Sequence, residues 1–211
     1  MEVEAEAPSG TTDAGELERR RRAALAGHTG DETMARQLLR DASPRVRATA
    51  LGALGRLGRA TPVDVAAALA DDDPLVRGRA CTEAVRMAAV DLVPVLRDAD
   101  PSVVEAAAWA LGERGRADPG VVPGLVYVVA GHEDALCREA AVAALGAIGH
   151  RDGLAAILAA LGDKPAVRRR AVLALAPFEG PEVQLALEKA LDARDRQVRQ
   201  AAEDLMAAGS G

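Results

Sequence analysis

Apolar residues recur along the chain at intervals of about thirty residues, each time within the same local pattern. The first residue of each copy, which we call the anchor, is Val46, Val76, Val103, Cys137, Val167 or Val198. An alanine stands four residues after every anchor, and an apolar residue stands eight residues after it. Positions 0, +4 and +8 share one face of a helix, so the pattern predicts six amphipathic helices.

An acidic turn, often with a proline, precedes these helices, as in residues 41–44, 71–74 and 98–101. Aspartate caps a helix and proline fits its first turn, so these turns are expected to start the anchor helices. Apolar stretches upstream of the turns predict further helices over residues 63–69, 91–96, 121–129, 154–161 and 183–191. Each repeat is therefore expected to be a helical hairpin.

A hairpin of about 30 residues cannot bury both of its faces alone, so successive hairpins must stack. Residues 17–26 match part of the pattern and are expected to form an N-terminal capping helix. Residues 1–15 have no apolar period and predict a disordered acidic leader. We therefore expect one domain over residues 16–211: an all-α solenoid of six hairpins plus the capping helix, with the second helices lining a concave surface.

The repeated unit has the form DxDPxVRxxAAxALGxxG, as in DASPRVRATALGALGRLG at residues 41–58 and DADPSVVEAAAWALGERG at residues 98–115. It resembles the HEAT repeat, and more narrowly the short HEAT-like type named after phycobilisome lyases. The resemblance covers residues 17–208. Proteins of this kind include scaffolds, adaptors, bilin-attachment subunits, a di-iron hydroxylase and, more distantly, DNA glycosylases. The resemblance therefore implies the fold but leaves the function open.

The charge balance argues against nucleic acid as a partner. The chain carries 26 basic and 32 acidic residues, and neither the whole chain nor the part after the leader has a basic excess. No apolar run is long enough to cross a membrane. Two cysteines cannot form a stapling framework, and we therefore expect a reducing, cytoplasmic location.

Charged residues form two columns in register with the repeats. In the family that the unit resembles, such columns form a structural ladder along the stack, and we expect the same here. The ladder residues are Asp41, Arg47, Asp71, Arg77, Asp98, Arg138, Asp163, Arg168 and Arg199. The third repeat departs from the pattern because it has Val104 in place of the arginine.

Candidate chemistry is sparse. The related hydroxylase holds iron with His-Glu pairs just after the anchors, and none of the three histidines, His28, His132 and His150, occupies such a position. Cys81 and Cys137 fall on the apolar side of second helices, where thiols pack as small hydrophobes. We therefore predict no catalytic residue, no metal and no cofactor.

Trp109 is the residue that fits a plain scaffold least well. It stands at position +6, which points away from +4 and toward the predicted concave surface. Two interpretations remain open: the ring is an anchor for a partner, or it packs between repeats. The residues expected to surround it on that surface are Arg79, Glu83, Arg86, Glu105 and Glu113.

These observations favour a non-catalytic scaffold or adaptor that binds a protein or peptide on its concave surface, as a monomer. The alternative, which follows from the family resemblance, is an accessory subunit for attaching a tetrapyrrole to a carrier protein. The two differ in a simple observable, because only the second predicts visible absorbance on mixing with a tetrapyrrole.

Overall fold

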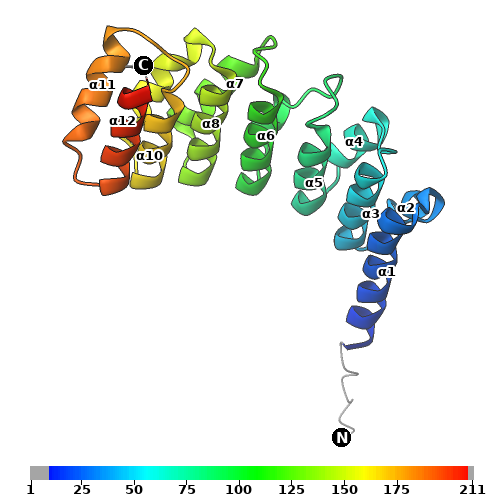
Figure 1. Ribbon diagram of the computed structural model, residues 1–211. Helices are drawn as coiled ribbons and strands as arrows, with labels where there is room; N and C mark the ends of the chain where they lie inside the picture. The colour runs from blue at the N-terminus through cyan, green and yellow to red at the C-terminus, as the bar shows by residue number, and fades with distance from the viewer. Residues whose placement is uncertain (1–9, 209–211) are drawn as a thin grey trace, which may run out of the picture. The chain divides into compact units, whose positions relative to one another are not determined.

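The computed structural model describes residues 10–208, and these form an all-α fold without strands (Figure 1). The α-helices are α1 (Gly10–Thr29), α2 (Glu32–Leu38), α3 (Pro44–Arg56), α4 (Pro62–Leu69), α5 (Pro74–Ala84), α6 (Pro101–Arg114), α7 (Val121–Gly131), α8 (Ala135–Ile148), α9 (Leu154–Ala160), α10 (Pro165–Ala174), α11 (Pro181–Leu191) and α12 (Arg196–Ala208). Two short 3₁₀ turns are η1 (Pro94–Arg97) and η2 (Arg151–Gly153). The predicted all-α class of helical hairpins is confirmed.

The helix starts follow from the acidic turns. Asp100 caps α6 by accepting from the Ser102 backbone N–H at 2.9 Å, and Asp134 caps α8 by accepting from the Leu136 N–H at 2.8 Å. Prolines occupy the first helical position of α3, α6 and α10, where their missing N–H costs no hydrogen bond. The proline-containing turns therefore set where the second helices begin.

The chain divides into two compact units, which comprise residues up to Glu83 and residues from Ala84 onward. In the first unit, α1 packs on α2 and α3, and α2 packs on α3. Its buried side chains include Ala23, Leu38, Val46 and Ala50. The expectation of one continuous domain over residues 16–211 stays a prediction.

In the second unit, α6, α8, α10 and α12 stand side by side in that order, and α7, α9 and α11 pack beside them (Figure 1). The predicted stripe forms the core in both units. All six anchors are at most 2% exposed, and the alanines at +4 are fully buried. The hydrophobic period therefore identified the buried face of every second helix.

Small residues bring the second helices unusually close together. A side-chain carbon on Gly112 of α6 would lie 2.9 Å from the Ala144 Cα of α8, and one on Gly146 of α8 would lie 2.7 Å from the Ala174 Cα of α10. Backbone atoms leave no room for a larger residue at either glycine. The spacing of these helices is therefore fixed by glycine facing alanine.

Two predicted elements differ from the structure. Residues 91–96 were expected to form a helix, but only the 3₁₀ turn η1 forms there. The repeat is short, because Val76 and Val103 are only 27 positions apart, and Pro94 cannot donate a helical hydrogen bond. In addition, α1 begins at Gly10, inside the expected leader, because a nucleated helix extends until something stops it. Residues 1–9 of that leader lie outside the described residues.

Candidate functional site

The second-helix face of the unit from Ala84 onward carries a groove of about 780 Å³. It is lined by residues of α6 and α8 and by Arg170 of α10. The lining residues with the smallest apolar side chains, which we call the floor, are Ala106, Gly112, Ala140, Ala143, Ala144 and Ala147. Because these side chains are short, an extended segment placed in the groove would approach the helix backbones closely.

Trp109 forms one wall of this groove and is 45% exposed. Its neighbours on the helix, Ala107 and Leu111, are buried, as their positions at +4 and +8 require. The indole is thus open to solvent on one side and covered on the other. Leu136, which is 56% exposed at the start of α8, adds a second apolar side chain to the same groove.

The charged residues of the groove are mostly acidic. Glu105 and Glu113 are exposed on α6, on either side of Trp109 in sequence. Across the groove, Arg170 Nη2 lies 3.4 Å from Glu139 Oε1. That pair largely neutralises itself, so the carboxylates of Glu105 and Glu113 give the groove a net negative charge.

The structure brings together only part of the predicted surface. Glu105 and Glu113 line the groove with Trp109, whereas Arg86 is exposed in the turn after α5 and does not line it. Arg79 and Glu83 belong to the other unit, where Arg79 Nη1 lies 3.7 Å from Glu83 Oε1. The partner-binding role of all these residues stays a prediction.

Sequence reasoning missed Leu136, Glu139 and Arg170, which complete the groove. All three lie on neighbouring helices, at positions −1, +2 and +3 relative to their anchors. A projection of the +6 direction from α6 onto α8 and α10 would have pointed to this side of those helices. The columns of a single helix do not show how that helix faces the next one.

The groove continues toward α12 as a shallower depression of about 390 Å³, which also includes Glu139 and Arg170. Leu173, 49% exposed, lies in it. The depression is also lined by Ala166 and Ala201 and by polar residues, among which Gln200 Nε2 donates to Asp204 Oδ1 at 3.0 Å. The large exposed apolar side chains of this face are therefore Trp109, Leu136 and Leu173.

Arginine–aspartate pairs occur where successive hairpins meet. Arg47 Nη2 lies 2.7 Å from Asp71 Oδ1, Arg138 Nε lies 2.7 Å from Asp163 Oδ2, and Arg19 Nε lies 2.7 Å from Asp41 Oδ2. The Arg138 guanidinium lowers the pKa of Asp163 to about 2, against the opposing effect of burial. The Asp71 pKa is lowered by Arg47 for the same reason.

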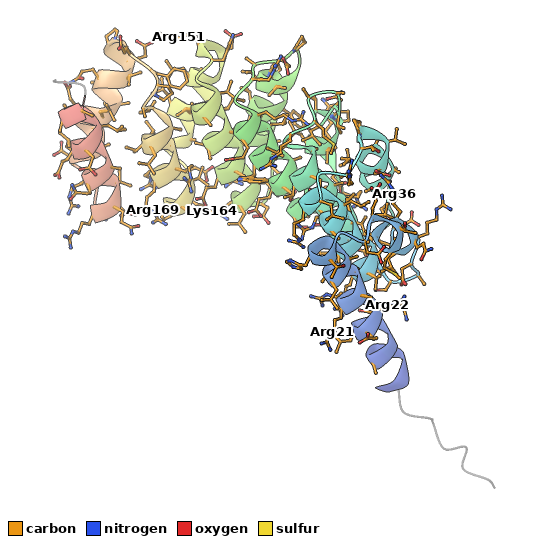
Figure 2. The ribbon with its side chains drawn as sticks, turned by 45° about the vertical axis from the view of Figure 1, so that its right-hand side comes forward. Arg21, Arg22, Arg36, Arg151, Lys164 and Arg169 are labelled. Atoms are coloured by element: carbon orange, nitrogen blue, oxygen red, sulfur yellow. The ribbon has the colours of Figure 1, made fainter. Side chains whose placement is uncertain are left out.

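The side chains of other ladder residues form hydrogen bonds with backbone groups of the turns. Arg77 Nη1 donates to the Asp71 carbonyl at 2.8 Å, and Arg199 Nη1 donates to the Ala193 carbonyl at 2.6 Å. Arg168 Nη2 donates to the Asp163 carbonyl at 2.8 Å. Asp98 accepts from the Asp100 backbone N–H at 2.9 Å. In Figure 2, Arg151 lies at one end of the α9–α10 hairpin, and Lys164, which follows Asp163, lies at the other.

The cysteines and turn histidines have structural partners. Cys81 and Cys137 are free and buried, and the Cys137 Sγ donates to the Pro101 carbonyl at 3.1 Å. Burial raises the pKa of Cys137 to about 11, which keeps it protonated at neutral pH. His132 Nδ1 accepts from the Asp134 N–H at 3.1 Å and so serves its turn.

Residues 10–208 contain no group of three or more His, Cys, Asp or Glu side chains placed to hold a metal ion. Nor does that part of the chain include a helix whose length and apolar character would suit it to cross a bilayer.

A sequence model of HEAT repeats matches residues 32–99, 89–166 and 122–207. No curated protein matches the chain in sequence. Among solved structures, YibA of Escherichia coli is 18% identical with a TM-score of 0.66, covering 87% of this chain and 70% of that one. A designed armadillo repeat protein in complex with the peptide (KR)4 is 18% identical with a TM-score of 0.51, covering 96% of this chain and 95% of that one. At these identities the structures show a common fold.

Proposed function

Because the chain belongs to the HEAT-repeat family, we propose that it is a non-catalytic binding module whose groove around Trp109 holds a segment of a partner protein. The observation that carries this proposal is the indole itself, 45% exposed above a floor of glycine and alanine. A large rigid ring left half open at a groove is the type of residue that dominates binding energy in protein interfaces.

The groove chemistry selects the kind of segment. Trp109 and Leu136 offer apolar contact for one large side chain, and the alanine floor admits an extended backbone beside it. Glu105 and Glu113 favour a lysine or arginine near that side chain. A designed protein of the same fold is solved with a basic peptide, which supports a segment of this character. We therefore propose a basic segment with an apolar anchor residue.

A peptide selected from a random displayed library against the full chain tests this proposal. The affinity of the selected peptide is then measured by fluorescence polarisation for the wild type, Trp109→Ala and Tyr127→Ala. Tyr127 is the matched control, because it is 61% exposed on α7 and lies outside the groove, with the Arg97 guanidinium 5.2 Å from its ring centre.

We expect Trp109→Ala to weaken binding about 30-fold or more, since a hot-spot residue contributes about 2 kcal/mol or more. Tyr127→Ala should leave the affinity within about twofold of the wild type. Equal losses for the two variants, or selected peptides that lack basic residues, would overturn the proposed groove or its preference for a basic segment.

A further inference from the structure

One arginine–aspartate pair of the ladder, which we call a rung, lacks its carboxylate. The residues that would supply it stand just after the first helix of each hairpin, and their carbonyls accept from the arginine of the following anchor helix. Arg47 Nη1 binds the Asp41 carbonyl at 2.9 Å, Arg77 Nη1 binds that of Asp71 at 2.8 Å, and Arg199 Nη1 binds that of Ala193 at 2.6 Å. Ala193 therefore occupies the place of Asp41 and Asp71.

The arginine that should meet this carboxylate is Arg168. Its Nε is buried and has no hydrogen-bond partner among the described residues. Asp195, two residues beyond Ala193, is engaged elsewhere, since its Oδ2 lies 3.2 Å from Arg169 Nη1. A buried donor without a partner costs about 1–3 kcal/mol, so this rung is unfavourable as it stands.

An arginine–aspartate pair is also missing between the third and fourth repeats, but there both partners are replaced. There His132 replaces the aspartate, with its carbonyl accepting from Arg138 Nη1 at 2.7 Å. The arginine of the preceding helix is also gone, and Val104 in its place is fully buried. Both charges are absent at that position. At Arg168 the arginine is kept while its partner is an alanine.

A pocket of about 620 Å³ lies where the carboxylate is missing; it is open to solvent on one side, and we call it the cavity. Arg168 and Ala193 both line it, and its walls are mainly aliphatic, with Leu158, Leu161 and Val172 among them. This volume is in the range of small-molecule sites.

Two further charged residues line the cavity. Glu182 pairs with Arg151, and Lys189 is exposed at the surface of α11. With Glu182 neutralised by Arg151, the unpaired charges of the cavity, those of Arg168 and Lys189, are positive.

The cavity is independent of the Trp109 groove. Arg168 and Arg170 are two residues apart on α10, which places their side chains about 200° apart around the helix axis. The groove is lined by Arg170 and the cavity by Arg168. A ligand in one would therefore not contact the other.

We propose that this cavity binds an aliphatic carboxylate whose head group takes the place of the missing aspartate on Arg168. The other rungs supply the geometry: in Arg138, Nε and Nη2 bind the two oxygens of Asp163 at 2.7 and 2.8 Å, while Nη1 holds a backbone carbonyl. In Arg168 the backbone carbonyl is held by Nη2 instead. On binding, the guanidinium turns to the orientation seen in Arg138, and the acyl chain lies along Leu158 and Leu185, which are accessible in the cavity.

Calorimetric titration of the full chain with decanoate tests this assignment, with decan-1-ol as the uncharged analogue. We expect decanoate to bind in a 1:1 ratio, and at least about tenfold more tightly than decan-1-ol, because a bidentate arginine–carboxylate pair is strong. Trp109→Ala should bind decanoate as the wild type does. Equal affinity for the alcohol, or no binding of decanoate, would overturn the proposal.

Ala193→Asp is the decisive variant, since it restores the carboxylate from within the chain. It should abolish decanoate binding and raise the midpoint of thermal unfolding. Ala193→Asn, which adds no charge, should weaken decanoate binding less and raise the midpoint less. Ala155→Asp is the matched control: it adds the same charge to an exposed position of α9 outside the cavity. If Ala193→Asp binds decanoate as tightly as Ala155→Asp does, Arg168 does not hold the carboxylate.

Discussion

The close packing of α6 against α8 predicts opposite effects for two substitutions that usually have the same effect. Gly112 and Gly78 are both inside helices, and replacing a helical glycine by alanine normally stabilises by about 1 kcal/mol. A carbon added at Gly78 meets nothing within 4 Å. One added at Gly112 would lie 2.9 Å from the Ala144 Cα and 3.0 Å from its Cβ, so α6 and α8 would have to separate.

We expect Gly78→Ala to raise the free energy of unfolding by about 0.8–1 kcal/mol. Overpacking costs about 1–3 kcal/mol, and contact with a backbone atom leaves little room to relax, so Gly112→Ala should lower it by about 1–2 kcal/mol in net terms. Urea denaturation followed by circular dichroism measures both values. A Gly112→Ala variant as stable as Gly78→Ala would refute the close approach of α6 and α8.

Two further predictions concern ionisable groups in the unit from Ala84 onward. The pKa of Asp163 is lowered to about 2 by Arg138, so its stabilisation, about 2 kcal/mol, is present above pH 4 and lost as the pH falls toward 2. The destabilisation caused by Asp163→Asn, measured by urea denaturation, should therefore shrink between pH 4 and pH 2, and a constant difference would contradict the ion pair. The Cys137 thiol, buried and with its pKa raised to about 11, should react with a thiol reagent far more slowly in the native chain than in urea. Equal rates in the two states would show that it is exposed.

The sequence was most informative where burial imposes a period. The anchors and the alanines at +4 had to be apolar because each second helix packs between neighbours, and the structure buries all of them. The same geometry places position +6 on the opposite side, but it left open whether the Trp109 ring packs between repeats; the ring is 45% exposed. A helix over residues 91–96 was wrongly predicted, because the apolar pattern continued through Pro94 in a repeat too short for a full hairpin.

Features that depend on how one helix meets the next could not be read from single columns. Glu139 and Arg170 belong to the groove only because α8 and α10 pack beside α6 in a particular register. The unpaired Arg168 was visible in principle, since Ala193 stands where Asp41 and Asp71 stand in their repeats. Its significance appears only when the buried Nε and the adjacent cavity are both known.

A crystal structure of the chain bound to a library-selected peptide tests the central claim most directly. The account predicts that the peptide crosses α6, α8 and α10 on the second-helix face, with an apolar side chain against Trp109 and a basic side chain within 4 Å of Glu105 or Glu113. A peptide bound along α7, α9 and α11, with the indole still open to solvent, would contradict it.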